Sequence, residues 1–265
     1  MRVGGIIPRQ DVEVETGPQP VVAEASAEAD RPGWVLSGRY RVHERLGSGG
    51  MADVFRAHDE LLGRDVAVKV FRTLGPAEEA GGPERQEREL QALARLSHPH
   101  LITLFDASIT DRPAYLVMEL VDGPSLAARL TDGPLPESEV RAIGSQIADA
   151  LAYVHAQGMV HRDVKPANIL LGTDGIAGDG VGRARLSDFG IVRLLGTERL
   201  TAADFTLGTA SYLAPEQARG GDVTPAADVY SLGLVLIEAL TGTRSFDGTP
   251  VEAVLARLSR SPDVP

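Results

Sequence analysis

The sequence contains no cysteine, and this absence excludes several kinds of structure. A disulfide framework and a metal site built from thiolates are both ruled out, and a reducing compartment is the natural expectation. No run of eighteen apolar residues occurs, so no transmembrane helix is predicted within the chain. The opening stretch MRVGGIIPRQ is too short and too broken by glycine for a signal peptide. We therefore expect a cytoplasmic location, with any membrane anchor outside the residues given.

Basic residues are also scarce. The chain has 26 Lys and Arg residues against 37 Asp and Glu residues, which gives a formal net charge of −11. A protein that binds a nucleic-acid backbone needs a basic face, so nucleic acid is not expected as a partner. With 265 residues, 43% of them hydrophobic, the chain is long enough to bury a substantial core in one large or two small domains.

Hydrophobic periodicity divides the chain into regions of different character. Residues 1–33 are rich in Glu, Ala, Pro and Gly and are predicted to form a disordered acidic leader. Apolar and polar residues then alternate in stretches typical of strands, and one stretch between them has helical spacing. The predicted strands cover residues 39–47, 52–59, 64–72, 101–108 and 114–121, and the helix covers 84–97. These elements predict a small, strand-rich lobe over residues 34–121.

The second half of the chain is predicted to be mostly helical. Residues 138–158 form a long amphipathic pattern that ends at Gly158, and residues 227–242 are nearly all apolar up to Gly242. A helix that is apolar on nearly every face must be buried. The layout therefore predicts an α+β fold with two lobes, the second covering residues 122–265.

A glycine-rich stretch, LGSGGMADVF, lies between the first two predicted strands. Gly47, Gly49 and Gly50 would let main-chain N–H groups approach a phosphate without interference from a Cβ atom. By itself the motif is a weak signal, because a tight hairpin also uses glycine and Ala52 stands where Gly-x-Gly-x-x-Gly requires its third glycine. A dinucleotide site is disfavoured, since that fingerprint opens a helix and here a strand follows.

Lys69 stands in the otherwise apolar strand VAVKV. A lysine in such a place can extend its stem to reach solvent, or it can bind the phosphates of a nucleotide. The second interpretation requires a carboxylate that orients the ammonium group. Glu89, on the helix that follows, is the predicted partner.

The stretch MVHRDVKPANILL places five polar or charged residues inside an apolar run. Ionised side chains are costly to bury unless they are paired or have a function, so this density indicates a functional loop. Asp163 could accept a proton from an attacking hydroxyl, Lys165 could stabilise a transferring phosphoryl group, and Asn168 could bind a metal ion. Asp188, in LSDFG at the end of a predicted strand, is a second oxygen donor of the kind that Mg²⁺ prefers.

Five motifs in this order resemble the protein kinase family: LGSGGM, VAVK with Glu89, HRDVKPAN, DFG and GTASYLAPE. GSGGM, HRDVKPANIL and GTASYLAPEQ are most similar to bacterial serine/threonine kinases of the eukaryotic-like, Hanks type. The resemblance covers residues 40 to about 265 and implies a two-lobed kinase fold with an antiparallel-sheet N-lobe and a helical C-lobe.

The resemblance implies ATP and Mg²⁺ as cofactors, with Mn²⁺ as an alternative metal. It makes Asp163 the catalytic base, supported by Lys165, Lys69 and Glu89, and makes Asn168 and Asp188 the metal ligands. The implied nucleotide-binding residues are Leu46, Gly47, Ser48, Gly49, Gly50, Met51, Val54, Ala67, Lys69, the gatekeeper Met118, Glu119 and Val121.

The implied partners are proteins that carry serine or threonine acceptors. Lys165 and Thr209 match the serine/threonine type rather than the tyrosine type. Thr201 and Thr206 are candidate autophosphorylation sites, which would require self-association, and a phosphate there could dock on Arg162.

The sequence also departs from the family pattern. The connection between Asn168 and Asp188 is longer than usual and predicts an enlarged hairpin tip. The C-lobe is expected to be incomplete, because the family's last helices would follow Pro265 and would supply an arginine for Glu216; part of the apolar helix at 227–242 should then meet water.

Two rival functions remain at this stage. One is a pseudokinase or nucleotide-binding scaffold with impaired turnover, and the other is a small-molecule phosphotransferase. GTASYLAPE, which resembles a peptide-positioning segment, disfavours the second.

Overall fold

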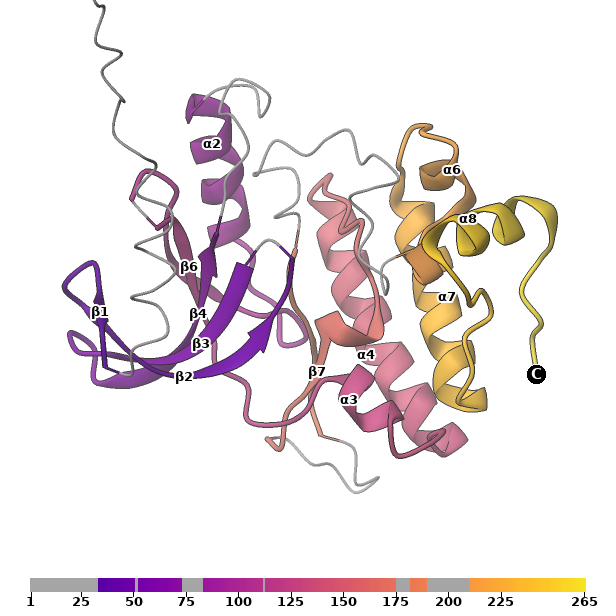
Figure 1. Cartoon of the computed structure of the whole chain (residues 1–265), viewed down its shortest axis with the longest axis horizontal. Coiled ribbons are helices and arrows are strands. Elements are labelled where there is room, and N and C mark those ends of the chain that lie inside the picture. The colour runs from indigo at the N-terminus through magenta and orange to yellow at the C-terminus, as the bar shows by residue number, and fades with distance from the viewer. Residues whose placement is uncertain (1–32, 51, 73–82, 112, 175–181, 190–209) are drawn as a thin grey trace, which may run out of the picture.

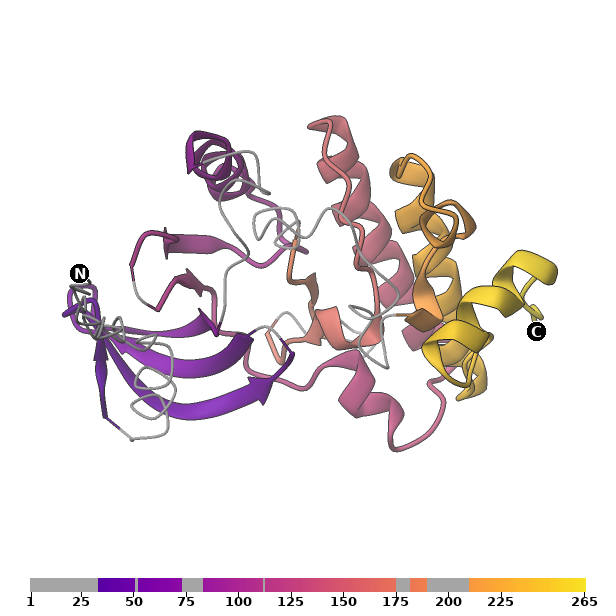
Figure 2. The ribbon, with the colours of Figure 1, turned by 45° about the horizontal axis from the view of Figure 1, so that its top comes forward.

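The computed structural model describes residues 33–50, 52–72, 83–111, 113–174, 182–189 and 210–265. Within these residues the chain forms two lobes, a sheet with one helix and a group of helices (Figure 1). A view from a second direction shows the same separation of strands from helices (Figure 2). The predicted leader lies outside the described residues, apart from Gly33, and the α+β, two-lobed prediction is confirmed.

The N-lobe is a six-stranded antiparallel sheet in the order β1-β2-β3-β4-β6-β5. Its strands are β1 (Val35–Leu36), β2 (Tyr40–Ser48), β3 (Ala52–Asp59), β4 (Arg64–Phe71), β5 (Leu104–Ser108) and β6 (Tyr115–Met118). The five predicted strands are therefore present, each within a few residues, and only the two-residue β1 was not predicted.

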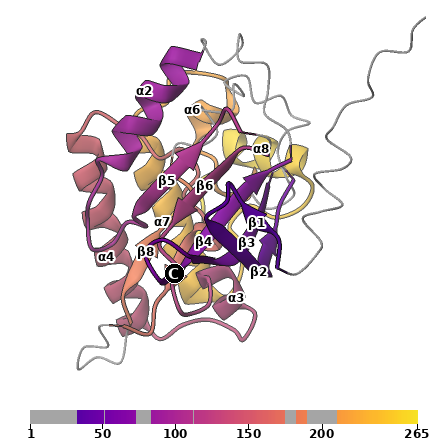
Figure 3. The same cartoon turned by 90° about the vertical axis from the view of Figure 1, so that its left-hand side faces the viewer.

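Alternation sets the two faces of this sheet. On one face Val42, Phe55, Val66, Val68 and Val117 are buried in a common cluster. Helix α2 (Pro83–Ala94) contacts β5 and lies alongside the sheet (Figure 3). The predicted helix at 84–97 is thus confirmed, and it ends a little earlier than the sequence pattern.

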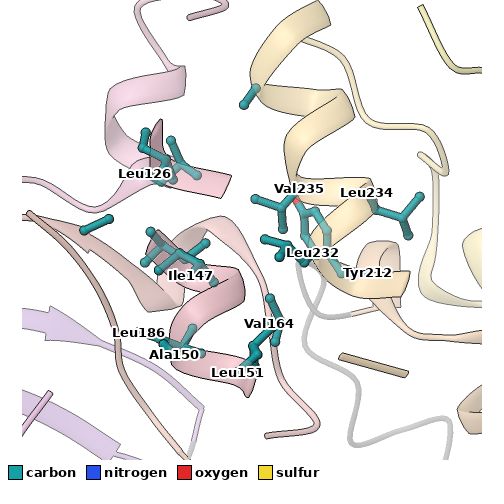
Figure 4. Close-up of a cluster of buried hydrophobic side chains, with 14 of the residues drawn as sticks. Leu126, Ile147, Ala150, Leu151, Val164, Leu186, Tyr212, Leu232, Leu234 and Val235 are labelled. Atoms are coloured by element: carbon teal, nitrogen blue, oxygen red, sulfur yellow. The ribbon is translucent and has the colours of Figure 1, made fainter. Parts of the chain in front are cut away.

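The C-lobe is built around two long helices, α4 (Glu137–Ala156) and α7 (Pro225–Thr241). Their buried faces pack against each other, with Ile147 and Leu151 opposite Leu232 and Val235 (Figure 4). Shorter helices surround this pair: α3 (Leu126–Leu130), α6 (Pro215–Ala218) and α8 (Pro250–Ser259).

Glycine ends both long helices, as the sequence predicted. Gly158 follows α4 with φ of 73°, and Gly242 caps α7 with φ of 71°. These left-handed conformations carry little strain only in glycine, which explains why the helical patterns stop where they do.

A small hairpin directly follows the catalytic-loop candidates and precedes Asp188. It is formed by β7 (Ile169–Leu171) and β8 (Ala184–Leu186), and the short helix η1 (Pro166–Asn168) comes directly before it. The N–H of Ile102 donates to the carbonyl of Leu186 at 3.0 Å, which ties β8 to the N-lobe. The enlarged tip predicted between these strands lies mainly at 175–181, outside the described residues.

Helix α7 is only partly covered by its neighbours. Leu232, Leu234 and Val235 are buried, whereas Val229 is 60% exposed and Leu240 is 36% exposed. Part of the apolar helix therefore meets solvent. Among the described residues, Glu216 makes no ion pair. In the same part of the chain, no helix is long and apolar enough to cross a membrane.

Candidate active site

The loop that carries Asp163 is anchored from beneath by a buried carboxylate on α7. Asp228 accepts hydrogen bonds from the N–H of His161 at 2.8 Å and from the N–H of Arg162 at 2.7 Å. The ring Nε2 of His155, on α4, lies 2.8 Å from the same carboxylate. Arg162 has φ of 71°, an unfavourable conformation for a non-glycine residue that these contacts stabilise. Sequence reasoning missed Asp228, although an aspartate inside an apolar helix was a signal.

His161 connects this loop to the segment that holds Asp188. Its ring Nε2 lies 2.9 Å from the carbonyl of Ser187, and its ring meets the Phe189 ring edge-on, with centroids 5.0 Å apart. Burial lowers the pKa of His161, so the ring is neutral at physiological pH. A neutral ring in contact with both segments fixes the spacing between Asp163 and Asp188.

Asp163, Lys165 and Asn168 lie in direct contact. Lys165 Nζ is 2.8 Å from Asp163 Oδ2, and Asn168 Nδ2 donates to the same oxygen at 2.9 Å. Asn168 Nδ2 also donates to the main-chain carbonyl of Asp163 at 2.8 Å. The structure thus brings together the three residues that the sequence singled out, and it fixes the carboxylate from two sides.

Lys69 reaches across from the sheet to the C-lobe side of the site. Its Nζ lies 2.7 Å from Asp188 Oδ1, with both side chains mostly shielded from solvent. A carboxylate does orient this lysine, and here it is Asp188. Glu89 lies half-buried on α2, and its predicted pairing with Lys69 stays a prediction.

Several of the residues predicted to surround the base of a nucleotide lie on neighbouring strands of the N-lobe sheet. Ala67 and Met118 are cross-strand partners and both are buried. Val54 and Val121 are half-buried, while Leu46 is 50% exposed. Val54, Ala67 and Met118 belong to one hydrophobic cluster of the sheet. The role of these residues in binding a base stays a prediction.

The backbone at Glu119 restricts how this segment could bind a base. Its N–H donates to the carbonyl of Thr103 at 2.9 Å, so the Glu119 carbonyl is the main-chain group of this residue that stays a candidate for binding a base. Behind Met118 lies a cavity of about 50 Å³, lined among others by Leu104, Leu116 and Phe189.

Arg185 is a further residue that the sequence did not identify. It lies on β8, is only 6% exposed, and places its Nε 3.1 Å from Glu119 Oε1. Its Nη1 also donates to Asp174 at 2.8 Å. One guanidinium therefore links Glu119 to Asp174, which lies in the connection between β7 and β8.

The residues present fit a magnesium-bound triphosphate. A Cβ atom at Gly47 would meet nothing within 4 Å, and one at Gly49 would meet only the Ala52 carbonyl at 3.6 Å, so the loop backbone has open space beside it. The hydrogen bonds of Asn168 to Asp163 use its amide nitrogen, so its Oδ1 is the atom suited to a metal ion. With Asp188 this makes two protein oxygen donors, a number typical of Mg²⁺ sites completed by phosphate and water.

Comparison with known proteins agrees with this geometry. Residues 40–261 match the protein kinase domain family model. The chain belongs to the protein kinase family. It is 41% identical to the serine/threonine-protein kinase PrkC of Bacillus subtilis over 214 residues, which cover 80% of this chain and 32% of PrkC. It is 40% identical to PknA of Mycobacterium tuberculosis over 244 residues, 89% of this chain and 54% of PknA.

Solved kinase structures show the same fold. The crystal structure of the Mycobacterium tuberculosis PknI kinase domain superimposes with a TM-score of 0.63 at 32% identity, covering 82% of this chain and 79% of that one. The resemblance to bacterial Hanks-type kinases is therefore confirmed. This kinase chain spans about a third of the length of PrkC and about half that of PknA.

Some predicted residues of this kinase domain lie outside the described part of the chain. They are Met51 in the glycine-rich loop, Thr201 and Thr206 in the segment before GTASYLAPE, and Thr209 within that motif. Their roles stay predictions. Arg162, the predicted phosphate dock, is described and half-buried beside the anchored loop.

Proposed function

We propose that this kinase domain transfers the γ-phosphoryl group of Mg-ATP to serine or threonine hydroxyls of proteins. The proposed acceptors include its own activation segment, from Asp188 to Glu216. The observation that carries the proposal is the contact of Asp163 with Lys165 and Asn168, close to a segment in which Asp188 pairs with Lys69. A chain that only bound partners would need none of these three contacts. The names of its relatives, PrkC and PknA among them, support serine and threonine as acceptors.

The proposed roles follow from charge and position. Bound Mg-ATP would supply the phosphoryl group and a metal ion that neutralises its charge. Asp163, held by Asn168 and Lys165, would orient the acceptor hydroxyl and accept its proton. Lys165 would then stabilise negative charge on the group in transfer, because its ammonium is already within 2.8 Å of the catalytic carboxylate.

The N-lobe would bind the rest of the nucleotide. Lys69 would exchange part of its contact with Asp188 for phosphate oxygens, while Asp188 and Asn168 would hold the metal. Residues 46–51 would cover the phosphates, and Val54, Ala67, Met118, Glu119 and Val121 would surround the base. Mn²⁺ could replace Mg²⁺ at the same oxygen donors.

The finer organisation is part of the same proposal. We assign residues 34–121 to the N-lobe and 122–265 to the C-lobe, with the nucleotide between them. Protein substrates and a second copy of the chain, for autophosphorylation at Thr201 and Thr206, are the proposed partners. A cytoplasmic location is proposed because ATP is the expected phosphoryl donor.

Incubation with γ-labelled ATP, Mg²⁺ and a generic basic protein tests the function, with phosphoamino-acid analysis of the product. The proposal predicts label on serine and threonine in both the added protein and the chain itself. Binding of ATP without any transfer would instead support a nucleotide-binding scaffold. Transfer to small molecules alone would support a small-molecule phosphotransferase.

A further inference from the structure

Arg72, directly after β4, forms four hydrogen bonds to the glycine-rich loop and its flanks. Its Nε and Nη2 donate to the two carboxylate oxygens of Asp53, at 2.8 Å and 2.6 Å. Nη2 also donates to Ser48 Oγ at 2.8 Å, and Nη1 donates to the main-chain carbonyl of Gly49 at 3.0 Å. One side chain therefore holds both sides of the loop.

The register of the sheet explains why Arg72 reaches this loop. Ser48 and Asp53 are the last cross-strand pair of β2 and β3 before the turn, and Ala52 pairs with Phe71 on β4. Arg72 follows Phe71, so its side chain extends from the end of β4 across the neighbouring ends of β3 and β2. β4 also carries Lys69, so the contact fixes the loop to the strand that holds the predicted phosphate-binding lysine.

The contact defines the backbone of the turn itself. The N–H of Gly49 donates to the carbonyl of Ala52 at 2.9 Å, and the carbonyl of Gly49 accepts from Arg72. Both main-chain polar groups of Gly49 are thus occupied within the protein. The Gly49 N–H is therefore not free to bind a phosphate, and these contacts hold the turn from within the protein.

The pair of Arg72 and Asp53 is stronger than an ordinary surface ion pair. The guanidinium binds the carboxylate through two parallel N–H groups, a geometry that lysine cannot reproduce. The Asp53 side chain is only 15% exposed. Burial raises the pKa of Asp53, but the hydrogen bonds from Arg72 and Ser48 outweigh it, and the pKa lies below its ordinary value.

A loop rich in glycine needs such a contact if it is to bind phosphate well. Glycine has more backbone freedom than any other residue, so a loop with glycine at 47, 49 and 50 loses much entropy when its N–H groups converge on a ligand. Holding the loop in its binding shape beforehand lowers this cost and raises affinity.

We propose that Arg72 is a positioning residue, which holds the glycine-rich loop in the shape that binds the phosphate groups of the nucleotide. It acts through Asp53, Ser48 and Gly49 and does not itself contact the nucleotide. The inference rests on the proposed function, because it assumes that the loop covers the phosphates of ATP.

The test compares ATP with adenosine, which has the same base and sugar but no phosphates. Arg72→Ala is expected to raise the dissociation constant for ATP about five- to tenfold and to change that for adenosine less than twofold. In steady-state assays the KM for ATP should rise more than kcat falls, with the KM for the protein substrate unchanged. Arg72→Lys should give an intermediate effect, since it keeps the charge without the bidentate geometry.

Arg56→Ala is the matched control. Arg56 binds Asp65 on the same sheet, at 2.6 Å and 3.2 Å, and its side chain is 44% exposed, against 41% for Arg72. It lies away from the glycine-rich loop, so its loss should leave both ligands bound as in the wild type. Asp53→Asn should reproduce Arg72→Ala, and the exchanged pair Asp53→Arg with Arg72→Asp should recover part of the ATP affinity.

Equal losses for ATP and adenosine, or the same loss of ATP affinity in Arg56→Ala, would overturn the inference. ATP binding that Arg72→Ala and Arg72→Lys leave unchanged would overturn it as well, with the proposed function intact. A wild-type chain that binds adenosine but gains nothing from the phosphates would instead contradict the proposed function.

Discussion

At the scale of single residues, Asp163 is placed by contacts rather than by burial. Lys165 and Asn168 hold its carboxylate from two sides, and Asp228 holds the backbone before it. We therefore expect Asp163→Asn to lower kcat by about 10² to 10⁴-fold, the range typical of a positioned general base. The melting temperature should change little. Rate measurements on Asp163→Asn and on Asp132→Asn, an exposed control, check this; near-wild-type turnover in the first would rule out the assignment.

Arg257 shows how a charged residue can stabilise the C-lobe from within. It lies on α8, is 4% exposed, and donates to the carbonyls of Ala210, Leu213 and Ala253. Burial lowers its pKa to about 10, so the guanidinium remains charged at neutral pH. Removing it leaves buried carbonyls without a donor.

Arg257→Met is therefore expected to lower the free energy of unfolding by about 2 to 4 kcal/mol. Arg141→Met is the control, because Arg141 forms an exposed ion pair with Glu137 and its replacement should cost less than about 0.5 kcal/mol. Chemical denaturation of both variants measures the difference. Equal, small losses in the two would show that the buried contacts contribute little.

Asp59 predicts how the N-lobe responds to acid. Hydrogen bonds from Arg39 lower the pKa of Asp59 to about 2, below its unfolded value near 4. The contact between Asp59 and Arg39 therefore stabilises the folded state fully above about pH 4, and this stabilisation is lost as the pH falls toward 2. The melting temperature, measured between pH 5 and pH 2, should fall more steeply for the wild type than for Asp59→Asn. Parallel curves would contradict this account.

At the scale of elements, periodicity predicted well wherever local sequence decides the structure. Strands β2 to β6 and helices α4 and α7 follow from alternation, apolar spacing and glycine at the helix ends. The two-residue β1 and the short helices α3 and α6 were not predicted. They contain too few residues for a periodic signal and form through contacts with distant parts of the chain.

The same distinction holds within the site. Asp163, Lys165 and Asn168 lie within six positions of one another, so a local motif reveals them. Asp228 is 65 positions from Asp163, and Arg185 meets Glu119 across 66 positions, so only the packed structure shows what they contact. The pairing of Lys69 with Asp188 across 119 positions likewise needed the structure.

Asp228 connects helix α7 to the loop that carries Asp163. Removal of the buried Asp228 carboxylate would leave the N–H groups of His161 and Arg162 without this acceptor. Asp228→Ala should lower the free energy of unfolding by about 2 to 4 kcal/mol and also reduce kcat. Asp222→Asn, at an exposed position before α7, should affect neither. Denaturation and rate measurements on both variants check the claim. An Asp228→Ala variant with the stability and the kcat of the wild type would refute it.

At the scale of the whole molecule, the site is formed by both lobes. Lys69 comes from the sheet, Asp163 and Asn168 come from the loop after α4, and Asp188 follows β8. A ligand bound between the lobes must therefore stabilise both. Saturating Mg-ATP, at about 100 times its dissociation constant, is expected to add about 2.7 kcal/mol to the free energy of unfolding. Lys69→Met should lose most of this gain, measured by thermal shift, and an undiminished gain would contradict the role of Lys69.

The central claim is that this kinase domain performs phosphoryl transfer and does more than bind nucleotide. The most direct measurement follows the label of γ-labelled ATP in the wild type and in Asp163→Asn, with Mg²⁺ and a basic protein as acceptor. The account predicts label on serine and threonine in the wild type and a loss of at least about 100-fold in Asp163→Asn, with ATP binding retained in both. Labelling that is equal in the two proteins, or absent from a wild type that binds ATP, would contradict it.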